Sequence, residues 1–166
     1  MKKLILITLP ILLVFTAYAQ KSKFGHVNSA AIFEAMPERA EAKSAIEKYA
    51  KQLEDQLLAM NSEFEQKYNA YLEEAETYSP AIKQSKEKEL SDLQSRIQNF
   101  QMSAQTDLQN KEQELLEPIY NKIKDAIKQV GQENSFMYIY DISTLLYYSD
   151  ESIDVTEMVK TKLQKK

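Results

Sequence analysis

Apolar residues recur with an eleven-residue period between residues 37 and 131, and this spacing constrains the fold more than any other feature of the sequence. Successive steps of 3, 4 and 4 residues correspond to about 3.67 residues per turn, which is close to the natural period of an α-helix. Helices with this pattern pack almost straight or with slight right-handed coiling. We therefore expect two long helices that form an antiparallel coiled-coil hairpin. The pattern falls at Ile46, Tyr49, Leu53, Leu57, Met60, Phe64, Tyr68, Tyr71 and Ala75, and then at Leu93, Ile97, Ala104, Leu108, Leu115, Ile119, Ala126 and Val130.

One turn-like cluster, Thr77-Tyr78-Ser79-Pro80, separates the two helices. Proline cannot continue the helix before it, and it suits the first turn of the helix after it. We therefore place a hairpin arm at 37–131 with its tip near 77–82. At a rise of 1.5 Å per residue, a helix of about forty residues is about 60 Å long, so the arm should protrude from the rest of the chain.

Two residues of the second helix are expected to disturb it. Pro118 removes a backbone hydrogen bond and clashes with the preceding turn, which predicts a kink near the base of the arm. Gly131 is expected to end the helix as a left-handed cap.

The first nineteen residues have the pattern of a secretory signal peptide. Lys2 and Lys3 precede an apolar run at Leu4–Phe15, and Ala17-Tyr18-Ala19 then forms a cleavage site before Gln20. The run is shorter than the about 20 residues that span a bilayer, which disfavours the alternative of an uncleaved anchor. We therefore predict that 1–19 is removed and that the mature chain is exported.

Charge and composition exclude several classes of partner. The chain has 21 Lys and Arg against 25 Asp and Glu; two lysines lie in 1–19, so 19 bases oppose 25 acids and the mature net charge is −6. This balance argues against general nucleic-acid binding and weakens attraction to anionic lipid surfaces. Without cysteine there is no disulfide framework and no thiol chemistry.

The segments that flank the arm, 20–36 and 132–166, are expected to form a small body. A strand is predicted at Phe24–Val27, followed by a short helix that is capped by Asn28 or Ser29 and breaks at Met36 before a proline. Beyond the arm, Phe136–Tyr140 and Leu145–Tyr148 are predicted to pair as a β-hairpin. Asp154–Glu157 should then cap a last helix with Val155, Val159 and Leu163 on one face.

This body is too small to stand alone. Three short strands cannot build a sizeable core, and open sheet edges invite pairing with another chain. We therefore predict a mainly α fold whose small β body is completed by oligomerisation. The candidate residues for that contact are Phe24, Val27, Met137, Ile139 and Leu146.

The residues that enzymes and cofactors require are scarce. Gly25 and Gly131 are the only glycines, so no phosphate-binding loop can form, and a serine triad would have to use the single histidine, His26. Clusters of His and Cys for a metal are missing as well. The sequence therefore predicts a protein that is not an enzyme and binds no cofactor or metal.

The arm tip is the candidate contact on the arm. Tyr78 and Ile82 lie beside Lys83, Lys86 and Lys88, a local basic patch on an acidic protein. This patch could contact a client protein or a lipid surface, peripherally rather than as an integral segment. The alternative is a solvated turn, as is usual for charged coiled-coil faces.

The order of these features resembles the Skp/OmpH family of periplasmic chaperones, over essentially the whole mature chain. The segments that carry the resemblance are Phe24-Gly25-His26-Val27-Asn28, Met36-Pro37-Glu38, Pro118-Ile119-Tyr120, Lys122-Ile123, Ala126-Ile127, Val130-Gly131, Met137-Tyr138-Ile139-Tyr140-Asp141, Leu146-Tyr147-Tyr148, and Ile153-Asp154-Val155-Thr156 with Val159. Each motif is weak alone, but their order and spacing are fairly specific.

The resemblance implies a periplasmic homotrimer whose strands form a small β-barrel body and whose three arms enclose a cavity. It also implies that unfolded outer-membrane β-barrel proteins are held there without ATP. Well-known family members are basic, whereas this mature chain is acidic, so a lipopolysaccharide site is not carried over. The alternative from another class is a structural coiled-coil adaptor of the cell envelope that docks one folded partner through the tip.

Overall fold

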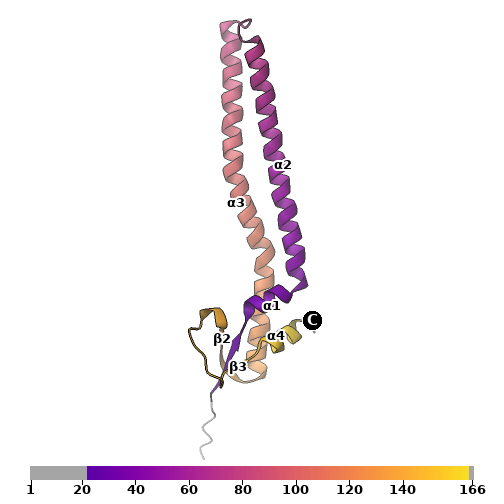
Figure 1. Ribbon diagram of the computed structural model, residues 1–166, viewed down its shortest axis with the longest axis vertical. Coiled ribbons are helices and arrows are strands. Elements are labelled where there is room, and N and C mark those ends of the chain that lie inside the picture. Colours follow the sequence, from indigo (N-terminus) through magenta and orange to yellow (C-terminus); the bar gives the residue numbers. More distant parts are fainter. Residues whose placement is uncertain (1–21, 165–166) are drawn as a thin grey trace, which may run out of the picture.

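A computed structural model describes residues 22–164, so the predicted signal peptide at 1–19 lies outside the described residues. Figure 1 shows two long helices side by side as an arm, with the short elements gathered around the lower end of α3. This arrangement confirms the predicted mainly α fold with a small β body and a helical hairpin. The elements are β1 (Lys23–Val27), α1 (Ser29–Ala35), α2 (Pro37–Glu74), α3 (Pro80–Glu133), β2 (Phe136–Asp141), a 3-10 turn (Ile142–Thr144), β3 (Ile153–Asp154) and α4 (Thr156–Gln164).

The ends of the arm helices follow from local sequence. Met36 is extended (φ −79°, ψ 128°), as expected for a residue before proline, and α2 begins at Pro37. At the tip, the Ser79 Oγ accepts a hydrogen bond from the Ile82 N–H (3.4 Å) and caps α3. With 54 residues against the 38 of α2, α3 extends beyond its partner and enters the body.

Most of the eleven-residue stripe forms the seam between α2 and α3, whereas its last residues, Ile119, Ala126 and Val130, pack in the core of the body. Its residues are buried or half-buried in the structure, with the exception of Tyr68, which is 44% exposed. Tyr68 lies at the margin of the seam and stacks on Phe64, with ring centroids 6.0 Å apart. Helical periodicity therefore identified the apolar face of each helix correctly, but it included one residue, Tyr68, that is exposed.

The two expected disturbances of α3 have different outcomes. The helix continues through Pro118 and, as predicted, bends between the body and the upper arm (Figure 1). Leu115 before the proline and Ile119 after it both pack on the core. Gly131 is not a left-handed cap: α3 ends at Glu133, and the positive φ (56°) belongs to Ser135.

The sheet is parallel, with the order β2-β1-β3. The predicted hairpin is therefore wrong, because 145–148 is not a strand and the third strand is Ile153–Asp154. After β2, the Asp141 carboxylate accepts hydrogen bonds from the N–H groups of Ser143 (2.8 Å) and Ser29 (3.2 Å). These bonds fold the chain into a 3-10 turn and lead it away from β2, so that β3 reaches the other side of β1.

The core lies where α1, the lower part of α3 and α4 meet the inner face of the sheet. Both ends of the chain thus pack on the same stretch of the arm helix. The buried residues of this core are Val27, Ile32, Met36, Ala42, Ile119, Ile123, Ala126, Val130, Val155 and Val159.

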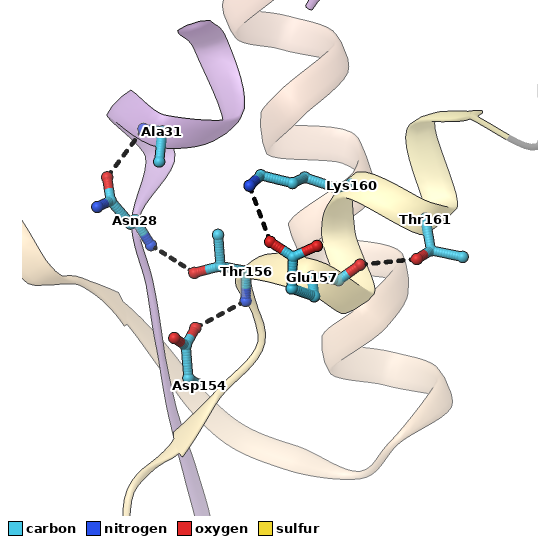
Figure 2. Close-up of polar contacts among 7 residues, drawn as sticks. All are labelled: Asn28, Ala31, Asp154, Thr156, Glu157, Lys160 and Thr161. Carbon is cyan, nitrogen blue, oxygen red and sulfur yellow. Dashed lines mark hydrogen bonds and ion pairs between the residues drawn. The ribbon is translucent and has the colours of Figure 1, made fainter. Parts of the chain in front are cut away.

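A chain of polar contacts joins the start of α1 to the start of α4 (Figure 2). The Asn28 Oδ1 accepts from the Ala31 N–H (2.9 Å) and caps α1, while the Asn28 N–H donates to the Thr156 Oγ1 (3.0 Å). The Thr156 N–H in turn donates to the Asp154 Oδ1 (2.8 Å). Residues 128 positions apart in the sequence are thereby fixed at one corner of the body.

Gly25 provides a test of the packing between sheet and helix. A Cβ at this position would lie 3.0 Å from the Phe136 Cε1 and 3.3 Å from the Ile139 Cγ1. We expect Gly25→Ala to lower the free energy of unfolding by about 1–3 kcal/mol, measured by urea denaturation at matched protein concentration. Gly131→Ala is the control, because its Cβ would make an ordinary 3.4 Å contact and alanine favours a helix by about 1 kcal/mol. Equal stability of both variants would contradict this account.

Asp154 provides a test of the polar corner. Hydrogen bonds from Thr156 hold the pKa of the Asp154 carboxyl below its usual range. Because the folded pKa lies below the unfolded value of about 3.9, this contribution to stability is present above that pH and is lost as the pH falls through the folded pKa. We expect Asp154→Asn to lose less stability than the parent chain between pH 5 and pH 2, in urea titrations at each pH. An unchanged acid dependence would show that the carboxylate does not stabilise the corner.

Candidate functional site

The outer face of the sheet carries a ladder of aromatic rings. Phe24 on β1 faces Tyr138 on β2 in the strand register, and their stacked rings lie 6.2 Å apart. The Tyr138 and Tyr140 rings follow at 5.8 Å. All three side chains are about half exposed, so this face lacks the cover that α3 gives to the inner face.

The segment 145–152 continues this apolar surface. Leu146 is fully exposed and Tyr147 is 80% exposed, whereas Tyr148 stacks on His26 at 4.2 Å. His26 is buried, and its Nδ1 lies 2.9 Å from the Ser152 Oγ. The single histidine is thus a packed residue that connects this segment to β1.

An open cleft of about 660 Å³ lies between the aromatic ladder and this segment. It is lined mainly by apolar and aromatic side chains, among them Phe24, Tyr140, Leu145, Tyr148 and Ile153. Large contiguous apolar patches are uncommon on the surface of monomeric proteins. We call the exposed residues Phe24, Met137, Tyr138, Tyr140, Leu146, Tyr147, Tyr148 and Ile153 the body surface.

The five residues predicted for oligomerisation divide into two groups. Phe24, Met137 and Leu146 belong to the body surface. Val27 is buried in the core of its own chain, and Ile139 packs against that core beside Gly131. Strand alternation separates Phe24 from Val27 on β1, but it places Met137 and Ile139 on the same face of β2 and so could not have separated the two groups.

The five tip residues lie together on the first turns of α3 and the loop before it. Ile82, Lys83, Lys86 and Lys88 are exposed, while Tyr78 is half-buried and folds back on the arm. The Tyr78 hydroxyl donates to the Glu74 Oε2 (2.9 Å), and its ring lies 6.3 Å from that of Tyr71.

A carboxylate lies beside one of the tip lysines, Lys86, and offsets part of the basic character that the sequence suggested. Lys86 lies 3.7 Å from Glu89, which is also bonded to Lys67 of α2. The Tyr71 hydroxyl donates to the Glu87 Oε1 (2.7 Å), and this bond raises the pKa of Tyr71 to about 12. The tip is therefore a mixed-charge surface that is held together by contacts between the two helices.

The arm exposes large apolar side chains that lie off the predicted stripe. Leu58 and Leu72 on α2 and Met102 on α3 are more than half exposed. Sequence reasoning missed these residues, because it asked only which positions the helices bury against each other. The signal was present, since all three fall outside the eleven-residue pattern.

Neither a metal site nor a membrane-spanning helix is found in the described part of the chain. Residues 22–164 hold no group of three or more His, Asp or Glu side chains that could bind a metal ion. No helix among them is both long enough and apolar enough to cross a bilayer.

Comparisons with known proteins agree on one family. The model of a family described as "Outer membrane protein (OmpH-like)" matches residues 23–163. No curated protein matches the sequence. A solved structure from Caulobacter crescentus, described as a proposed outer membrane chaperone (OmpH-like), is similar with a TM-score of 0.74 and 14% identity, over 87% of this chain and 85% of that chain. At this identity the likeness supports the fold alone.

Proposed function

The chain belongs to the OmpH-like family, and we propose that it is an ATP-independent holdase chaperone of the periplasm. Its clients would be unfolded outer-membrane β-barrel proteins, kept from aggregating after export. The signal peptide predicted at 1–19 would direct the chain to that compartment. No cofactor is part of this proposal.

The arm is the observation that carries the proposal. Its two helices bury their apolar stripe against each other and leave a charged surface with a few scattered apolar side chains. Such a surface cannot form one tight hydrophobic contact, but several arms around one client can add many weak contacts. Weak contacts hold an unfolded chain and also release it without an energy source.

The body surface supports assembly into a homotrimer with the arms on one side. Its eight residues would be covered by neighbouring subunits, and the open edges of β2 and β3 could pair between copies and close a small barrel. The number three is taken from the resemblance to the Skp/OmpH family. The residues at the tip (Tyr78, Ile82, Lys83, Lys86 and Lys88) are proposed as a peripheral client contact.

The body surface is tested by Leu146→Glu combined with Tyr147→Glu. These side chains contact little within one chain, so the variant should fold, but two carboxylates at the covered surface should prevent association. We expect light scattering to show a trimer for the parent chain and a monomer for the variant. Leu72→Glu is the control, since this residue is also apolar and exposed (55%) but lies on the arm. A variant that remains trimeric would refute the proposed interface.

The holdase role is tested by diluting a urea-unfolded outer-membrane β-barrel protein into the purified chain. We expect a soluble complex of three subunits with one client in size exclusion with light scattering, whereas the client alone precipitates. Precipitation in spite of the chaperone would refute the proposal. If the chain instead binds a single folded partner, and substitution of the tip lysines abolishes that binding, the result would support an adaptor.

A further inference from the structure

The arm is densely charged except at its middle. On α2 no charged residue occurs between Asp55 and Glu63, and on α3 none occurs between Arg96 and Asp107. The second gap spans ten consecutive residues, 97–106, in a chain in which 28% of residues are charged. We call 56–62 and 97–106 together the uncharged belt.

The two halves of the uncharged belt lie at the same height of the arm. Contacts below and above it fix the antiparallel register: Lys122 donates to Glu38 (2.7 Å) near the base, and Tyr71 donates to Glu87 (2.7 Å) near the tip. Interpolation between these pairs places 56–62 of α2 beside the first half of 97–106. The gap in charge therefore surrounds the hairpin and is not confined to one helix.

The uncharged belt presents both apolar and amide groups to solvent. Leu58 is 60% exposed and Met102 is 65% exposed. Asn61, Ser103 and Thr106 use their side chains to bond carbonyl groups of their own helices. Five amide side chains make no hydrogen bond to the described protein: Gln56, Gln98, Asn99, Gln101 and Gln105.

The small extent of the uncharged belt and its lack of charge limit what can bind there. Two exposed apolar side chains offer far less than the about 800 Å² that each partner contributes to a stable interface, which disfavours a second copy of the arm. A charged headgroup or an acidic or basic peptide would find no opposite charge. An extended polypeptide fits, because amide side chains both donate and accept and can thus serve unpaired backbone N–H and C=O groups.

We propose that the uncharged belt binds an extended, uncharged segment of the unfolded client, with Leu58 and Met102 in contact with its apolar side chains. This inference rests on the proposed holdase function and assigns the client contact to a part of the arm. Strands of outer-membrane barrels alternate apolar and polar residues, and such segments match a surface that offers both kinds of contact. The charged stretches of the arm above and below the belt would remain hydrated when the client segment binds.

The test compares two pairs of substitutions with the same chemistry. Leu58→Gln with Met102→Gln removes the apolar contacts of the uncharged belt, and glutamine keeps the helix propensity. Tyr68→Gln with Leu72→Gln is the matched control, since these residues are 44% and 55% exposed, lie nearer the tip among charged neighbours and are not part of the proposed tip contact. Affinity is measured by titrating each trimer into a fluorescently labelled, urea-unfolded β-barrel protein.

We expect the belt pair to weaken client binding about tenfold and the control pair to change it by less than about twofold. Equal effects of the two pairs, or no effect of the belt pair, would overturn the assignment. A photoreactive amino acid in place of Gln98 should also cross-link the client more strongly than one in place of Gln113, an exposed residue between charged neighbours below the belt, and the reverse order would count against the belt.

The parent chain separates this inference from the holdase proposal. If the parent chain keeps the client soluble and the belt pair binds it equally well, only the assignment of the contact is wrong. If the parent chain fails to bind any unfolded β-barrel protein, the holdase proposal and the belt assignment are both refuted. Light scattering and circular dichroism of each variant confirm that assembly and helicity are retained.

Discussion

The packing of both chain ends on the lower part of α3 is the interaction on which the rest of the structure depends. Ile119, Ile123, Ala126 and Val130 form one wall of the core, and Val155, just before α4, and Val159 of α4 close it from the other side. Because α3 runs on without interruption from this core to the tip, the body and the arm share one rigid element. The position of the arm relative to the body is therefore set by a continuous helix and by the Glu38–Lys122 bond at its base.

The apolar surfaces of the arm and of the body differ in how they are covered. The apolar stripe of the arm is covered within one chain, because the residues of each helix pack against those of the other along the seam. The body has too few residues for the same solution and leaves an aromatic face and two sheet edges open. In the proposed homotrimer, assembly would depend on the body alone and the arms would stay free of one another. Such a division would suit the proposed holdase, whose arms must separate around a client while the body stays assembled.

Much of the fold could be predicted because it follows from local rules. The eleven-residue period located both helices, and Met36-Pro37 and Ser79-Pro80 located their starts. The sheet could not be predicted, because an apolar strand reads the same whether its partner is parallel or antiparallel. Asp141 decided between them through bonds to Ser143 and Ser29, and Ser29 is 112 residues distant. Gly131 was misread for a similar reason: it gives room to Ile139 and does not turn the chain.

The candidate sites show the same limit. Phe24, Met137 and Leu146 were correctly expected at the surface of the body, but the burial of Val27 depends on the side of the sheet that α3 covers. The gap in charge at 56–62 and 97–106 is visible in the sequence, yet its two halves become one surface only through the register of the hairpin.

That register also gives the uncharged belt a physical reason to lie in the middle of the arm. A client segment near the base would meet the rigid core, and a segment at the tip would meet paired charges that bind water well. Midway along the arm, exposed amides and two apolar side chains offer contacts whose desolvation costs little and whose individual strength is low. If three arms present such belts around one cavity, their weak contacts act together on a single client chain. Affinity then arises from the number of contacts and requires no single tight site.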